Sequence, residues 1–268
     1  MPPRRLLLAL PALAASGAAL RATATPALPA PEVPICRGGL RRVAEVTERD
    51  ATTPAAVEAD FLEKLGLLEG HLIIGHRLLD AGQSRLAVPH FGHPIRELYT
   101  WLEPRLARRR TPGFEAELQA MEAWAEAGNK GTGGAFEVAW KALGPKLRGA
   151  RDTTPAGLRA SPRFMLGHLS MMIYDVASDY GESIERGRIV NIVEYHDSMG
   201  FLLYAAATAA EHREGSGAAE MQEAAAVIED LRRLAYPELL PPGRPPTSVS
   251  HVRARSDRLQ AIADRAPV

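Results

Sequence analysis

The sequence predicts an all-α protein, and three observations support that fold class. From Pro54 onward, apolar residues recur at the three- and four-residue spacing of a helix. The alternation of β-branched residues that marks a strand is nearly absent. Glycine and proline stand at the ends of the periodic segments, as Gly82 does after the first of them. We therefore expect a helical bundle in which two pseudo-repeated four-helix hairpin units share one core.

The composition is that of a globular protein without an affinity for nucleic acid. The chain has 268 residues, of which 46% are hydrophobic and 24% are charged. Lysine plus arginine and aspartate plus glutamate balance at 32 each, and no long basic block occurs. Beyond the first thirty residues, no apolar run approaches the roughly 18 residues that a membrane helix needs. We expect no membrane span in the mature protein.

Residues 1–30 have the features of a cleaved export signal. Arg4 and Arg5 precede an apolar run from Leu6 to Leu20, and the small residues Ala22-Thr23-Ala24 follow as a cleavage pattern. The paired arginines resemble a twin-arginine signal, which implies export of an already folded protein. An ordinary secretory signal is the alternative. Both interpretations predict a periplasmic or secreted protein.

Residues 31–53 should form a proline-rich, extended leader. The single cysteine, Cys36, lies in it, so the chain cannot form an internal disulfide. The first helix is expected to begin after Thr53, a capping residue followed by proline, and to end before Gly82. Two prolines interrupt the next segment, which should begin as a short turn and become a regular helix only from Pro94.

The rest of the chain divides into two helical halves, a linker between them and a C-terminal segment. The halves span residues 54–150 and 162–236, with a linker over 151–161. Residues 237–268 contain a proline-rich stretch and a last helix. Helices are expected over residues 54–81, 94–109, 112–127, 135–147, 162–187, 189–212, 217–236 and 248–265.

The two halves resemble weak copies of one another. Each has a long helix, a glycine break and a histidine-bearing second helix, in that order. Chance matching in an alanine-rich helical chain is the alternative to duplication. The matching positions are Gly70-His71-Leu72 with Gly167-His168-Leu169, Gly82 with Gly181, and His93 with His196.

Histidines in the first half have the spacing of a metal site. His71 is the one polar residue of an apolar helix stripe. His93 and Glu97 stand at i and i+4, a spacing at which both can chelate a divalent metal or the carboxylate can orient the imidazole. His90 joins their face if the helix continues through Pro94. The alternative to a metal site is an ordinary contact between His93 and Glu97 one helix turn apart.

A second polar stripe lies on the helix expected after Pro162. His168, Met172, Asp175 and Asp179 follow at four-three-four spacing, and two aspartates on such a face are hard to bury without a cation. The alternative is that this stripe faces water. His196 lies on an apolar face of the following helix, where a core histidine bonded to a carbonyl is the alternative to a ligand.

These residues lead to one hypothesis about a bound transition metal ion, with iron, copper and zinc as candidates. Nearby methionines keep copper among them, since thioether sulfur favours Cu(I). The expected ligands are His71, His93, Glu97, His168 and His196, followed by His90, Asp175, Asp179 and Met172. The signatures of common hydrolases are missing, so we do not expect catalysis to be the main role.

An exported, duplicated helical chain with interior histidines and carboxylates resembles the imelysin-like periplasmic proteins associated with bacterial iron uptake. The resemblance covers roughly residues 54–237. The Gly-x-His-x-x-Glu signature of that family has no match, although Gly92-His93-Pro94-Ile95-Arg96-Glu97 carries the same residue types with one extra position. The resemblance implies a role in iron uptake and transfers no ligand residues.

The sequence therefore predicts an exported, periplasmic helical-bundle protein that binds a transition metal, with iron as a candidate, as a carrier or scavenger. Two alternatives remain. One is a metal-free helical interaction module that docks an envelope protein partner. The other is a metal-dependent enzyme that uses Glu97 as its base.

Overall fold

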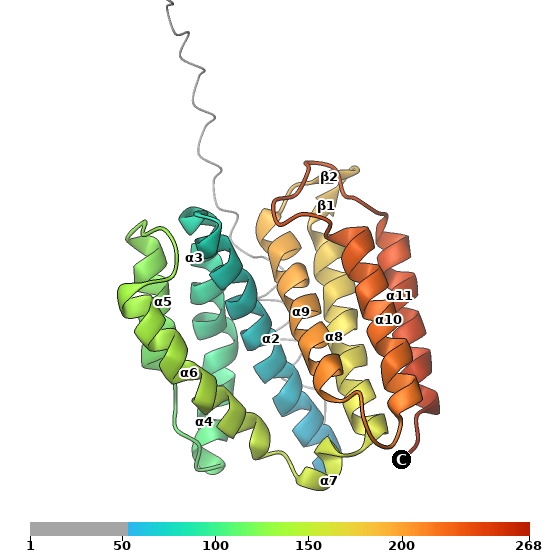
Figure 1. Ribbon diagram of the computed structural model, residues 1–268. Helices are drawn as coiled ribbons and strands as arrows, with labels where there is room; N and C mark the ends of the chain where they lie inside the picture. The colour runs from blue at the N-terminus through green and yellow to red at the C-terminus, as the bar shows by residue number, and fades with distance from the viewer. Residues whose placement is uncertain (1–52) are drawn as a thin grey trace, which may run out of the picture. The chain divides into compact units, whose positions relative to one another are not determined.

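The structure, a computed structural model, describes residues 53–268, which belong to one compact helical unit (Figure 1). The all-α prediction is confirmed. The predicted export signal, the twin-arginine pattern and the leader with Cys36 lie outside the described residues. Among the residues that are described, no helix is both long enough and apolar enough to cross a membrane.

The helices follow one another with short connections. In the first half they are α2 (Pro54–Asp80), α3 (Ser84–His93), the π-helix η1 (Pro94–Tyr99), α4 (Thr100–Arg108), α5 (Glu115–Glu126) and α6 (Gly134–Asp152). The short α7 (Ala156–Arg159) lies in the predicted linker. The second half contains α8 (Pro162–Glu182), α9 (Ile192–Glu211) and α10 (Ala218–Ala235), and the C-terminal segment contains α11 (Val249–Arg265).

Three helices of the second half and the C-terminal helix close into a bundle. Helix α8 packs against α9 and α11, and α10 packs against the same two helices, so each has two neighbours in a ring. Helix α2 packs on the outside of this ring against α9 and α8, and also contacts α3 of the first half (Figure 1). Helix α5 packs against α3, and α6 packs against α5. One continuous hydrophobic cluster contains residues of both halves, as a shared core requires.

Local sequence explains where most helices begin and end. The side chain of Thr53 caps α2 by accepting from the Ala56 amide. After α2, Gly82 adopts a φ of 71°, a left-handed conformation that favours glycine. Helix α8 ends at Glu182, earlier than expected, because Arg186 and Gly187 both have positive φ and turn the chain into a hairpin. The hairpin strands are β1 (Ile184–Glu185) and β2 (Arg188–Ile189).

The expectation of a broken segment around Pro89 and Pro94 is wrong. Residues Ser84–His93 are already α-helical, with Pro89 inside α3. The chain stays helical through Pro94, but there it passes into the π-helix η1. Pro94 has no N–H to give to the carbonyl four residues earlier, and the regular α-helical hydrogen-bond pattern ends at this residue. Buried packing of Ala87 and Phe91 holds α3 in place despite its proline.

Helices α2 and α9 approach each other closely because glycine faces glycine at their contact. A Cβ added to Gly200 would press on the carbonyl oxygen of Gly70, and one added to Gly70 would lie 2.5 Å from the ring of Phe201. Without side chains at these two positions, the helix backbones can touch. The contact brings the residues on either side of it, among them His71 and Asp197, within reach of one another.

We expect Gly200→Ala to destabilise the protein by about 1–3 kcal/mol, since the added methyl group overpacks a backbone contact. Gly149→Ala is the matched control, because nothing lies within 4 Å of a Cβ at that exposed helical position. That control should be neutral or stabilising by up to about 1 kcal/mol. Urea unfolding followed by circular dichroism measures both. A Gly200→Ala protein as stable as the control would contradict the close approach.

Candidate metal centre

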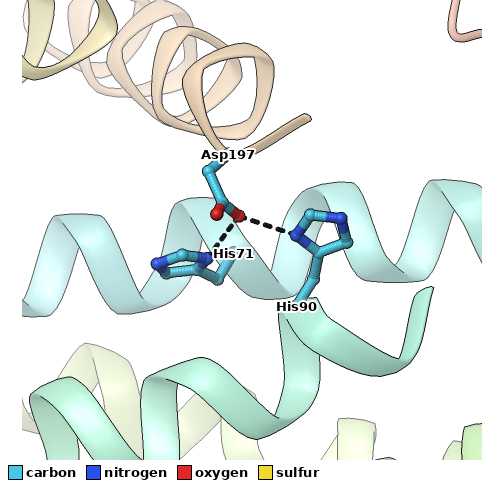
Figure 2. A group of neighbouring side chains, drawn as sticks. All are labelled: His71, His90 and Asp197. Atoms are coloured by element: carbon cyan, nitrogen blue, oxygen red, sulfur yellow. Dashed lines mark hydrogen bonds and ion pairs between the residues drawn. The ribbon is translucent and has the colours of Figure 1, made fainter. Parts of the chain in front are cut away.

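Two histidines and an aspartate from three helices meet in the core. His71 lies on α2, His90 on α3 and Asp197 on α9 (Figure 2). The Nδ1 atoms of both histidines lie 2.6 Å from the same carboxylate oxygen, Oδ1 of Asp197. The exposed fractions of His71, His90 and Asp197 are 5%, 0% and 2%. Residues more than a hundred positions apart in the chain thus form one buried polar group.

The Asp197 carboxylate and the His71 imidazole stabilise each other's charge. An ionised carboxylate only accepts, so each imidazole donates its Nδ1 hydrogen to Oδ1. Burial alone would raise the pKa of Asp197, but the attraction of His71 and His90 outweighs it and holds that pKa well below its ordinary value. Burial lowers the pKa of His71, yet the attraction of Asp197, with smaller contributions from Glu97 and Glu194, raises it overall.

Two more histidines surround this group. The ring of His93 has its centre 6.3 Å from that of His71, and the ring of His196 has its centre 5.6 Å from that of His90. Burial lowers the pKa of His93 and of His196 to about 4, so both are neutral at pH 7. His196 donates from Nε2 to the Leu239 carbonyl oxygen, 3.1 Å away, which leaves its Nδ1 with a lone pair.

Several ring nitrogens of this cluster have unused bonding capacity. His90 Nε2, His93 Nδ1 and His196 Nδ1 are buried without a hydrogen-bond partner among the described residues. A buried polar atom left without a partner costs about 1–3 kcal/mol, and native structures rarely contain several together. A metal ion is one group that accepts imidazole lone pairs. We refer to His71, His90, His93, His196 and Asp197 as the histidine cluster.

The structure places most of the predicted ligands in or beside this cluster. Three of the five expected ligands, His71, His93 and His196, come together. His90, a candidate of second rank, lies at the centre of the cluster. Glu97 is half-buried in η1, and its charge acts on His71. The i and i+4 pair of His93 and Glu97 therefore lies at the partly exposed side of the cluster.

His168 is elsewhere, which corrects its inclusion in the same site. Its Nε2 atom lies 3.2 Å from the Tyr204 hydroxyl, in the lining of a pocket that also includes Leu62 of α2. His168 does not belong to the group of His71, His90 and Asp197, whose ligand atoms lie within 4.8 Å of one another. The charges that act on His168 are those of His212 and Arg151, not those of the cluster. The stretches around His71 and His168 are similar in sequence, but the two histidines lie in different surroundings.

The other residues of the α8 stripe do not join the histidine cluster either. All of them are buried, so the alternative of a stripe that faces water is wrong. Met172 packs beside Gly66, and a Cβ there would lie 3.0 Å from its sulfur. Asp175 is buried on the same helix. Asp179 lies with Glu182 and Glu194 in a separate acidic group, whose ligand atoms are within 4.8 Å of one another.

Sequence reasoning missed Asp197, the residue that joins the cluster. The spacing of the histidines gave no reason to consider Asp197, the residue after His196. Its side chain points about 100° away from that of His196 around the helix axis. The available signal was the isolation of this acid. Asp197 is the only acidic residue between Tyr195 and Ala210, a stretch otherwise rich in apolar side chains.

We expect Asp197→Asn to lower the pKa of His71 from above its ordinary value to below it. Burial, which lowers the pKa, would remain, while the attraction that now outweighs it would be removed. Nuclear magnetic resonance titration of the histidine ring signals in chelator-treated protein measures this shift. An unchanged His71 titration would contradict the ion pair.

One family model matches the chain. Residues 155–264 match the iron permease-associated four-helix bundle domain, which corresponds to 110 of the 268 residues. The matched segment contains the closed ring of α8, α9, α10 and α11, together with Asp197, whereas His71 and His90 lie outside it. The match is to a domain associated with iron uptake and not to the imelysin-like family. No curated protein and no solved structure matches the chain.

Proposed function

We propose that the protein binds a transition metal ion, iron, in the histidine cluster and acts as a carrier in iron uptake. The observation that carries this proposal is the convergence of His71, His90 and Asp197 in the core, with unpartnered nitrogens on the neighbouring rings. Two imidazoles and one carboxylate are a donor set that Fe(II) accepts while keeping coordination positions open. The donor set by itself also suits zinc, and the match to an iron permease-associated domain favours iron.

The cluster needs only a small adjustment to hold an ion. Ligand atoms on one ion at bond lengths of about 2.1 Å lie about 3 Å or more apart. The Nδ1 and Oδ1 atoms are now 2.6 Å apart, joined by hydrogens. Replacing these hydrogens with an ion therefore requires the side chains to separate by a few tenths of an ångström. Binding would release protons, as it does at other sites where imidazole must be deprotonated.

The surroundings of the cluster suit uptake and release. His90, His196 and Asp197 are almost fully buried, whereas His93 and Glu97 are half-buried. These two residues supply an imidazole and a carboxylate at the partly exposed side, where an arriving ion would meet its first protein ligands. The partner of such a carrier would be an iron permease of the cell envelope, which the family match supports. Export to the periplasm, expected from the N-terminal sequence, would place the protein where such a partner takes up its cargo.

We expect the purified protein to bind one Fe(II) or Co(II) ion, and His90→Gln and Asp197→Asn to weaken that binding at least about 100-fold each. Both variants remove a ligand from the centre of the cluster. Anaerobic calorimetric titration gives the affinity, and elemental analysis gives the stoichiometry. Circular dichroism should show the helical content of the native protein in each variant.

The matched control is His168→Gln, which changes a buried histidine outside the cluster. It should keep the affinity of the native protein within about threefold. The proposal is wrong if His168→Gln loses as much affinity as the two cluster variants, or if Asp197→Asn binds the ion unchanged.

A further inference from the structure

A second polar site is formed by a pocket that the histidine cluster does not use. The pocket has a volume of about 350 Å³ and is lined by residues of α2, α6, α7, α8 and α9. That volume is at the lower end of the range for small-molecule sites. Charged side chains surround it, and the apolar Leu62 and Met165 contribute to its lining. The pocket is therefore suited to a small polar ligand.

Most of the charges around the pocket are already neutralised in pairs. Arg151 donates two hydrogen bonds to Glu69, at 2.8 and 3.1 Å. Arg159 donates to Asp152 at 3.0 Å. Three arginines line the pocket, and two of them are held in these ion pairs, in one of which burial raises the pKa of the Glu69 carboxyl to about 7. The excess of arginine over acidic residues in the lining is thus no argument for a purely anionic ligand.

One positive and one negative side chain remain. Arg148 on α6 and Glu211 at the end of α9 both line the pocket. Neither forms an ion pair with the other or with any further residue of the described chain. Arg148 comes from α6 and Glu211 from α9, and both side chains are exposed, so the lining offers a ligand one guanidinium and one carboxylate.

His168 offers a further donor. Burial lowers its pKa to about 4, so the ring is neutral at pH 7. The Nε2 atom of His168 lies 3.2 Å from the Tyr204 hydroxyl, and a hydroxyl that donates there leaves the ring hydrogen on Nδ1. That Nδ1 atom is buried and has no hydrogen-bond partner among the described residues.

We propose that this pocket binds a small zwitterion of the amino-acid class. The ligand carboxylate lies at Arg148, with the Nδ1 hydrogen of His168 as a second donor, and the ligand ammonium group lies at Glu211. The uncharged remainder of the ligand packs beside Leu62 and Met165. This site is separate from the histidine cluster and does not depend on metal binding there.

Calorimetric titration with three matched probes in chelator-treated protein tests this proposal. L-Leucine carries both charges, isocaproate is leucine without its amino group, and isoamylammonium is leucine without its carboxylate. We expect one molecule of leucine to bind, at least about tenfold more tightly than either analogue, because each analogue lacks one of the two charged contacts. The variants Arg148→Gln and Glu211→Gln should each weaken leucine binding by at least about tenfold.

Arg85→Gln is the control variant, since it removes an exposed arginine that is not part of the pocket lining. It should bind leucine as the native protein does. Absence of leucine binding, equal binding of isocaproate and leucine, or unchanged binding in Arg148→Gln would each overturn the proposal. Equal binding of isocaproate would instead identify a site for simple carboxylates.

Discussion

The buried negative charge of Asp197 is the constraint on which the centre of this structure depends. A carboxylate that is 2% exposed loses its hydration and is stable only if other charges or donors replace the water. His71 and His90 do so, and they come from helices α2 and α3 of the other half of the chain. The glycine contact between α2 and α9 permits the distance that this requires. The interaction therefore joins the two helical halves and at the same time gathers imidazole and carboxylate groups in the core.

Much of the fold could be predicted because helix formation is encoded locally. The capping residue Thr53 and the left-handed Gly82 mark the ends of α2 within one residue of the expected positions. Proline was the main source of error. Its effect on a helix depends on the packing around it, and Pro89 and Pro94 lie on a segment that α2 and α5 hold in place. The rules for helix ends and for proline consider only neighbouring residues, so they do not include this packing. They also did not predict the π-helix η1.

The site was predictable only in part, because it is formed by contacts between distant segments. His71, His93 and His196 stood out as polar residues on apolar faces, and the structure brings them together. Spacing along one helix could not show which of two similar faces points to the centre, and His168 was placed there wrongly. The pairing of Asp197 with a helix more than a hundred residues earlier depends on the tertiary packing of α2 against α9, which periodicity does not specify.

The central claim is that the ion occupies the place of the hydrogens between Asp197 and its two histidines. Anomalous diffraction from crystals grown anaerobically with Fe(II) tests it most directly. The account predicts a single iron peak about 2.0–2.3 Å from Nδ1 of His71, Nδ1 of His90 and an oxygen of Asp197. An iron peak only at the acidic group of Asp179, Glu182 and Glu194, with the histidines still bonded to Asp197, would contradict it.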